Sequence, residues 1–291
     1  MFSADLLANA VVSGILLGGF YAAVTIGLAI VFGQLDIVNI AHPAFIIVGA
    51  YVAYILNSHF GLDPVLVGIV AAPVFFFAGA LIYRVYFFAF ERTGQESLSG
   101  LAFFFGLMFI IEVVLILIYG VDYRLVQADY IGQTWRVGFV DFPLRMLVPF
   151  AVSLALTVAI HAYMSRTFIG RAIQAVAQDR VALQLMGADP VRIKQWAFGL
   201  GIATAAIAGS LLIVIGPVEP SVGRQYIGRV FAIVVLGGMG SIQGMFIAAL
   251  ILGVVESMVS TFAGPSWSPA VAFGVLALTL ALRPAGLFGR Q

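Results

Sequence analysis

The sequence lacks cysteine and almost lacks lysine, and these absences exclude several chemical functions. Without cysteine, the 291 residues hold no disulfide, no thiolate nucleophile and no thiolate metal site. The single lysine, Lys194, lies in VRIKQW and not in the Gly-Lys-Ser/Thr motif of a P-loop, so this chain is not itself an ATPase. The three histidines are far apart in the sequence, and neither GxSxG nor HExxH occurs. We therefore expect no enzymatic activity, no metal site and no bound cofactor.

Charged residues are also scarce, and their scarcity places the chain in a membrane. Only 9% of the residues are charged, 63% are hydrophobic and the mean hydropathy is +1.12, unlike a soluble domain. The apolar residues form continuous runs near the ~20 residues that cross a bilayer as a helix, without the alternation of barrel strands. The net charge of +1 gives no indication of a nucleic-acid partner. We predict an all-α, polytopic helix bundle that contacts membrane lipid and forms one transmembrane domain over residues 1–291.

The apolar runs predict about eight or nine membrane segments. Two of them are short or interrupted, because segment 39–56 begins NIAHPAF and segment 227–239 runs into a glycine cluster. Irregular backbone at membrane depth is tolerated only where protein or water shelters it, and paired short segments indicate a transport pathway between inverted repeats. We therefore expect broken helices at both places. The predicted segments are 9–32, 39–56, 64–88, 101–120, 146–163, 195–215, 227–239, 242–262 and 268–282.

Residues 165–194 form the longest polar interruption of the apolar sequence. Asp179 is placed as the N-cap of a short helix over 180–186, and Gly187 as the residue that ends it. Asp189, followed by proline, predicts the start of the next helix. The helix before Asp179 is amphipathic, with apolar residues on one face and arginine and glutamine on the other. Such a segment either offers a rigid projection to a partner protein or lies among the lipid headgroups.

The same segment resembles a part of a known family. The run GRAIQAVAQDRVALQLMGADPVRIKQWAFGLGIATAAIAGSLL is similar to the coupling loop of LivH- and LivM-type permeases of ABC importers. GLAIVFGQLDIVNIAHPAFIIVGAYVA, VVLGGMGSIQGMFIAALILGVVES and LRPAGLFG resemble further signatures of that family, although Pro43 stands where most relatives carry glycine or a small polar residue. The resemblance implies that a cytoplasmic loop at about 165–194 docks into a groove on an ATP-binding subunit. The predicted coupling residues are Arg171, Ala172, Ala175, Ala177, Gln178, Asp179, Met186 and Gly187.

The resemblance also implies a function, partners and a location. The chain would be a permease subunit that translocates a branched-chain amino acid or similar small polar solute received from a periplasmic binding protein. Two ATP-binding cassette subunits would use the ATP, and a second permease chain, identical or LivM-like, would supply the other half of the pathway in a bacterial inner membrane. With 165–194 in the cytoplasm, segments 39–56 and 227–239 run in opposite directions, as inverted repeats require. A self-contained channel or an ion-coupled secondary transporter is the alternative function.

Polar residues inside the predicted segments are candidates for the translocation pathway. An ionised side chain at the centre of a membrane helix costs about 2.5–3.5 kcal/mol, so Glu112 and Glu256 each bind a solute, drive ion coupling, or make a structural hydrogen bond. Asn39 and His42 begin a segment whose helix N-terminus would suit a carboxylate, although Asn39 could simply be the N-cap. The glycine cluster either opens backbone groups to a pathway or forms a plain loop. The predicted pathway residues are Asn39, His42, Glu112, Gly237, Gly238, Ser241 and Glu256.

Overall fold

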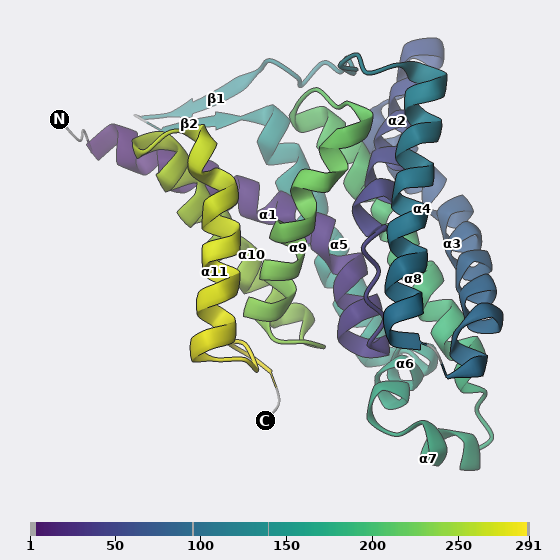
Figure 1. The fold of residues 1–291 in the computed structure, drawn as a ribbon. Coiled ribbons are helices and arrows are strands. Elements are labelled where there is room, and N and C mark those ends of the chain that lie inside the picture. Colours follow the sequence, from purple (N-terminus) through teal and green to yellow (C-terminus); the bar gives the residue numbers. More distant parts are fainter. Residues whose placement is uncertain (1–3, 95, 139, 290–291) are drawn as a thin grey trace.

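The computed structural model describes residues 4–94, 96–138 and 140–289, which form a helical bundle with one small hairpin (Figure 1). The all-α prediction is confirmed apart from that hairpin. The strands are β1 (Thr134–Val137) and β2 (Val140–Pro143), and 3₁₀ turns lie at η1 (Glu91–Thr93), η2 (Pro220–Val222) and η3 (Pro265–Trp267). The helices are α1 (Ala4–Leu35), α2 (His42–Phe60), α3 (Pro64–Ala89), α4 (Glu96–Tyr119), α5 (Leu144–Arg166), α6 (Phe168–Gln178), α7 (Arg180–Leu185), α8 (Pro190–Ile215), α9 (Gly223–Gly237), α10 (Ile242–Phe262) and α11 (Ser268–Leu282).

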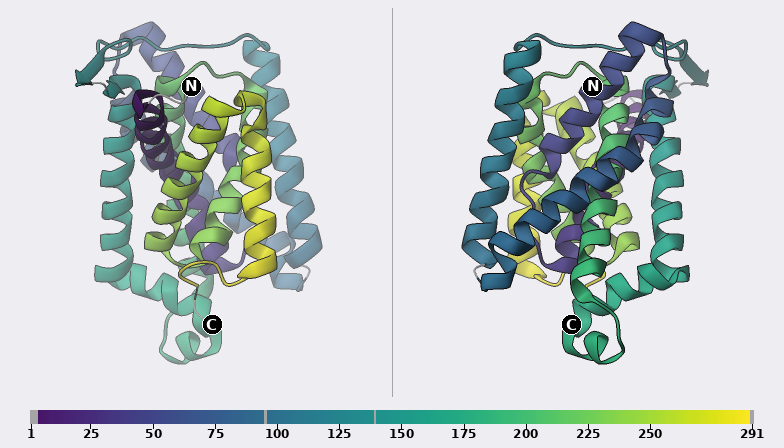
Figure 2. Two further views of the ribbon diagram at one scale, coloured as in Figure 1. Left: turned by 90° about the vertical axis from the view of Figure 1, so that its left-hand side faces the viewer. Right: turned by 90° about the vertical axis from the view of Figure 1, so that its right-hand side faces the viewer.

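Two largely buried helices, α1 and α8, form the centre of the bundle. Helix α8 packs against α1, α2 and α3, and α1 also packs against α5 and α10. Glycines permit these close approaches, since a Cβ on Gly18 would lie 2.6 Å from the Cα of Leu250, and one on Gly209 would lie 2.1 Å from the carbonyl oxygen of Ile46. The hairpin and the N-terminus lie at one end of the bundle, and α6, α7 and the C-terminus lie at the other (Figures 1 and 2).

The number of membrane segments agrees with the prediction of about eight or nine. Among the described residues, eight helices are long and apolar enough to cross a membrane, namely α1 to α5, α8, α10 and the helix that includes α11. Helix α9 has only 15 residues and ends at the glycine cluster, as the short segment 227–239 predicted. The chain is therefore a multi-pass membrane protein in which one helix, α9, is shorter than a full membrane span. The inverted repeats stay a prediction.

The second irregular stretch precedes α2 and does not interrupt it. Residues 36–41 are non-helical, and α2 begins directly after them. Ala41 is the N-cap and makes no side-chain cap bond, so the hypothesis that Asn39 caps this helix is wrong. Pro43 lies in the first turn, where its missing N–H removes no intrahelical hydrogen bond. Protein shelters this irregular backbone, because three of its residues are buried: Ile37, Asn39 and Ala41.

The predicted breaks in the polar segment are confirmed. The Asp179 carboxylate caps α7 by accepting hydrogen bonds from two backbone N–H groups, 2.8 and 2.9 Å away. Gly187 follows α7 with a φ of 82°, which glycine adopts without strain. Helix α7 ends at Leu185, one residue before the predicted end. Asp189 caps α8 by accepting from the N–H of Val191 at 2.9 Å.

The hairpin lies at the end of the bundle away from α6 and α7 (Figure 1). Arg136 and Asp141 face each other across the two strands, and the Arg136 Nε donates to Asp141 Oδ1 at 2.6 Å. This hydrogen bond holds the pKa of the Asp141 carboxyl below its usual value, because it stabilises the charged form. The Asn9 side-chain oxygen accepts from the Asp141 N–H at 2.9 Å, which fixes the first part of α1 to the hairpin.

The single lysine is buried, which the sequence did not indicate. Lys194 stands in the polar segment, yet its side chain points into the protein and pairs with Glu91 of η1. The Tyr83 hydroxyl donates to the other Glu91 oxygen at 2.8 Å. The pair therefore joins the start of α8 to the end of α3, close to the predicted coupling loop at about 165–194.

We expect Lys194→Met to destabilise the protein by about 3–5 kcal/mol, because it removes the cation beside a buried carboxylate. The double variant E91L/K194M should recover most of this loss, since an apolar pair needs no charge compensation. Thermal unfolding of the purified chain in detergent measures both effects. Arg192→Gln, an exposed substitution on the same helix, is the matched control and should change stability by less than about 0.5 kcal/mol. Equal unfolding temperatures for K194M and R192Q would contradict the prediction.

Candidate functional site

Helix α6 lies across one end of the bundle and buries one of its faces. It packs against α5, α8 and α1, with Ala172, Ile173 and Val176 buried. Arg171 and Gln178 are exposed on the opposite face. Thr167 caps the helix by accepting from the Gly170 N–H, so α6 starts at a fixed angle after α5. The predicted amphipathic surface helix is therefore confirmed. Of the remaining predicted coupling residues on α6, Ala175 is half-buried and Ala177 is exposed.

Helix α7 projects beyond the other helices (Figure 1). Its apolar side chains are exposed. Leu185 and Met186 are 84% and 83% exposed, and Val181 is exposed beside them. We call these three residues the apolar tip. Clustered apolar side chains on a projection rimmed by polar residues are typical of a protein–protein contact. Asp179 caps the start of α7, and Gly187 follows its end. These two predicted coupling residues therefore define the shape of the apolar tip.

A cleft of about 440 Å³ lies between α6 and the turn that joins α9 to α10. We call it the polar cleft, because glutamine, histidine and serine side chains line it. It brings part of the predicted coupling set, Ala177 and Gln178, next to Ser241 of the predicted pathway set. Its lining residues are Gly33, Gln34, His161, Met164, Gln174, Ala177, Gln178, Met239, Gly240, Ser241, Ile242, Gln243, Ala285, Phe288 and Gly289.

The turn between α9 and α10 is held by neighbours on several sides. Gly238 and Gly240 have φ values of 92° and 88°, which other residues rarely adopt. The Gln34 side chain donates to the Gly240 carbonyl at 2.8 Å, and the Ser241 hydroxyl caps α10 by accepting from the Gly244 N–H at 3.0 Å. Gly237 and Gly238 are buried and do not line the polar cleft. The predicted glycine cluster is thus a tightly packed turn.

Asn39 and His42 are fully buried where α1, α2 and α8 meet. His42 Nε2 lies 3.2 Å from the Val24 carbonyl oxygen, and a Cβ on Gly27 would touch the His42 ring and the Thr204 hydroxyl. His42 Nδ1 and both polar atoms of the Asn39 side chain make no hydrogen bond with the described residues. Buried polar groups normally have a partner, so these two side chains hold unused hydrogen-bonding capacity inside the bundle.

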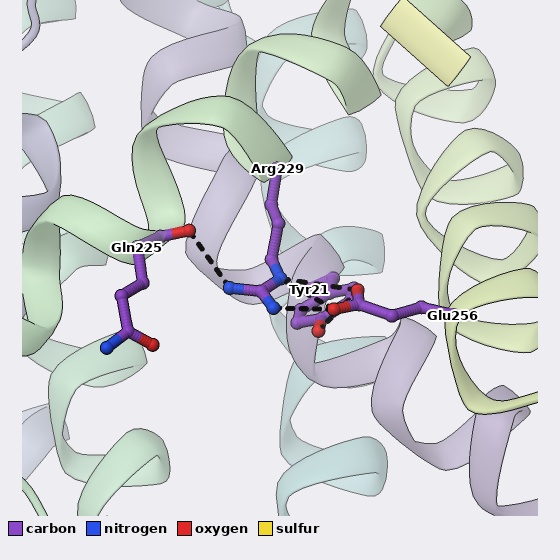
Figure 3. Close-up of polar contacts among 4 residues, drawn as sticks. All are labelled: Tyr21, Gln225, Arg229 and Glu256. Carbon is purple, nitrogen blue, oxygen red and sulfur yellow. Dashed lines mark hydrogen bonds and ion pairs between the residues drawn. The ribbon is translucent and has the colours of Figure 1, made fainter. Parts of the chain in front are cut away.

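Glu256 pairs with Arg229 inside the bundle (Figure 3). Arg229 Nε and Nη2 lie 2.9 and 2.5 Å from Glu256 Oε1, and the Tyr21 hydroxyl donates to Oε2 at 2.8 Å. Arg229 also donates through Nη1 to the Gln225 carbonyl at 2.9 Å. The guanidinium lies over the Tyr226 ring at 5.5 Å. The Glu256 carboxylate therefore joins α10 to α9 and α1. Of the roles that the sequence allowed for Glu256, this contact fits the structural hydrogen bond.

Glu112 is paired as well, in a less buried setting. Arg224 Nη2 lies 2.9 Å from Glu112 Oε1, and the Arg224 side chain is 50% exposed, against 12% for Arg229. Both membrane carboxylates thus meet an arginine from the half-length helix α9. Sequence analysis missed these arginines as partners. The available signal was the presence of two arginines, five residues apart, at the start of the predicted short segment 227–239: Arg229 lies inside it and Arg224 lies three residues before it.

Comparison with known proteins identifies similar chains over almost the whole length. Residues 10–280 match the family model described as "Branched-chain amino acid transport system / permease component". The high-affinity branched-chain amino acid transport system permease protein BraD of Pseudomonas aeruginosa is 30% identical, covering 96% of this chain and 94% of BraD. LivH of Escherichia coli K12 has the same identity and coverage. LivM of Escherichia coli K12 is 28% identical over 92% of this chain and 67% of LivM. No solved structure shows significant similarity.

We expect Arg229→Gln to destabilise the chain more than Arg224→Gln. The first variant leaves the buried Glu256 carboxylate without its cation, at a cost of about 3–5 kcal/mol. The second removes a half-exposed partner, whose pair contributes about 1 kcal/mol or less. Thermal unfolding in detergent compares the two, and R229Q/E256Q should recover part of the loss. If R224Q and R229Q unfold at the same temperature, the Arg229 pair does not anchor α9.

Proposed function

The chain belongs to the family of permease components of branched-chain amino acid transport systems, and from this premise we propose that it is the membrane-spanning subunit of an ABC importer. The apolar tip on α7 is the observation that carries the proposal, because a projection with exposed Leu185 and Met186 needs a protein groove to cover it. Two ATP-binding cassette subunits supply that groove and the ATP hydrolysis. This arrangement places α6 and α7 in the cytoplasm.

The proposed cargo is a branched-chain amino acid or a similar small polar solute. The similar proteins BraD and LivH bear names that describe high-affinity branched-chain amino acid transport. A periplasmic binding protein delivers the solute to the end of the bundle that carries the hairpin. A second permease chain, identical or LivM-like, completes the pathway, and the complex resides in a bacterial inner membrane. The likeness to both LivH and LivM supports either arrangement.

We propose a route by which the ATPase moves the pathway. Closure of the ATP-bound subunits shifts the apolar tip. This shift also moves helix α6, because only Asp179 separates α6 from α7. The polar cleft separates α6 from Ser241 and the turn after α9, so a shift of α6 changes the width of the cleft. The turn carries positive φ values at Gly238 and Gly240, and it connects a half-length helix to a full span. Movement there reorients α9 next to the pathway.

Four of the proposed pathway residues, those outside the turn after α9, divide into two groups by their surroundings. Asn39 and His42 keep unused hydrogen-bonding groups and are proposed to meet the solute when α1, α2 and α8 separate. Glu112 and Glu256 are proposed to position α9 beside the pathway, since each carboxylate pairs with an arginine. These pairs also disfavour the alternative of an ion-coupled transporter, because an arginine already occupies each carboxylate that would have to bind the coupling ion. Flux through the purified chain alone in liposomes would support that alternative.

A single cysteine at Gln178 tests the proposed partnership, since its thiol would be the only one in the chain. Gln178 is exposed at the end of α6, beside the apolar tip. In native membranes we expect a cross-link to a P-loop ATPase that changes when nucleotide is added. A cysteine at Gln133, exposed near the hairpin at the opposite end, is the matched control and should give no such product. Labelling of Q178C by an impermeant thiol reagent from outside intact cells would overturn the proposed orientation.

Substitutions at Gly187 test whether the shape of the apolar tip matters for transport. Because Gly187 has a φ of 82°, a β-branched residue is strained there, whereas asparagine tolerates the left-handed conformation. We expect Gly187→Val to reduce solute uptake at least tenfold, and Gly187→Asn to retain most of it. Uptake is compared at equal amounts of protein in the membrane. Normal uptake by G187V would count against docking through α7.

A further inference from the structure

An apolar groove lies on the outer face of the bundle between α3, α5 and α8. Its volume is about 510 Å³, which lies in the range of small-molecule sites. Every lining residue is apolar or aromatic, and the only polar side-chain atoms belong to Tyr163 and Trp196. We call it the α3–α5–α8 groove. It is lined by Ile69, Ala72, Pro73, Phe76, Phe77, Tyr163, Trp196, Leu200 and Ala203.

The groove is built by fixed contacts between α3 and α8. A Cβ on Gly199 would lie 2.8 Å from the Phe76 carbonyl oxygen, so the two backbones touch at its floor. The rings of Phe76 and Trp196 pack edge to face with centroids 4.9 Å apart. The Gln195 side chain donates to the Ala80 carbonyl at 3.0 Å, which ties the helices together just beyond the groove. Its shape therefore belongs to the helix packing.

The surroundings of the groove are those of a lipid-facing surface. All three helices are long and apolar enough to cross a membrane, and Phe77 and Trp196 are exposed at 71% and 48%. The α3 residues from Ile69 to Phe77 extend over roughly 12 Å at 1.5 Å per residue, which suits a stretch of extended acyl chain. Tyr163 and Trp196 lie at the end nearest α6 and α7, where amphipathic rings prefer the membrane interface.

Arginines stand beyond that end of the groove on α5 and α8. Arg166 follows Tyr163 by three residues on α5, and Arg192 precedes Trp196 by four on α8, so each shares a helix face with a lining residue. Both arginines are exposed, with Arg192 also 3.3 Å from the exposed carboxylate of Asp189. An apolar groove that ends at two cations is complementary to an acyl chain that ends at an anion.

We propose that the α3–α5–α8 groove binds one acyl chain of an anionic phospholipid, with the phosphate held by Arg166 and Arg192. The headgroup would lie beside the first turn of α8, close to Asp189 and the apolar tip. The lipid would therefore fasten α3, α5 and α8 together at the end of the bundle where α6 and α7 project.

The test measures retained lipid on the purified full-length chain by native mass spectrometry. The chain is exchanged into mixed micelles of detergent with dioleoylphosphatidylglycerol or dioleoylphosphatidylcholine. We expect one phosphatidylglycerol to be retained in preference to phosphatidylcholine. The double variant R166Q/R192Q should lose this preference, by about fivefold in affinity for each arginine. Arg145→Gln, an exposed arginine at the opposite end of α5, is the matched control and should retain the preference.

A groove-filling variant tests the acyl-chain part of the proposal. Ala203 is a lining residue of α8, and Ala203→Phe places a ring where the chain would lie, so retained lipid of either class should fall. If A203F does not fold, the double arginine variant still decides the outcome. Equal retention by wild type and by the double variant would overturn the proposal. A disulfide between Phe77→Cys chains, or from F77C to another permease chain, would place protein in the groove and also overturn it.

Discussion

Compensation of carboxylates by cations inside the bundle is the constraint on which the rest of the structure depends. An uncompensated charge at membrane depth costs several kcal/mol, so each carboxylate has to lie next to its cation in the folded chain. Two of these pairs join elements that are distant in sequence, and the third joins the consecutive helices α9 and α10; two of the three end on α9. Helix α9, with 15 residues, is shorter than the ~20 residues that cross a bilayer and is not among the eight candidate spans, so its position depends on these contacts. The pairs are Glu91–Lys194, Glu112–Arg224 and Glu256–Arg229.

The sequence predicts the elements of this fold better than the contacts between them. The caps at Asp179 and Asp189, the end of α7 before Gly187 and the shortness of α9 follow from signals within a few residues. The pairing of Glu256 with Arg229 depends on how α9 packs against α10, which no local pattern encodes. Lys194 shows the same limit, since a lysine in a polar segment reads as exposed until Glu91 is placed beside it.

In the candidate site, too, the sequence predicts the individual elements better than the contacts between them. Sequence resemblance indicated the coupling residues on α6 and α7, and the glycine cluster indicated a break after α9. Ala177 and Gln178 of α6 lie across the polar cleft from the turn after α9 because α6 packs against α5 and α1, and C-terminal residues also line the cleft. Asn39 was open to two interpretations from sequence, and the backbone decides against the N-cap, because α2 starts after Ala41. The Asn39 amide, which makes no hydrogen bond with the part of the chain that the structure describes, then becomes the more informative feature.

Helix α8 connects the proposed coupling element to the centre of the bundle. It begins at Pro190, directly after the α7 segment, and is buried along most of its 26 residues against α1, α2 and α3. No proline interrupts it after its first residue, so a displacement at its start is carried along its length as a rigid rod. The Lys194–Glu91 pair holds the first turns of α8, and Trp196 of the α3–α5–α8 groove lies in the same turns. Because α8 also encloses His42 together with α1 and α2, a force applied near the apolar tip reaches the buried polar groups through a single helix.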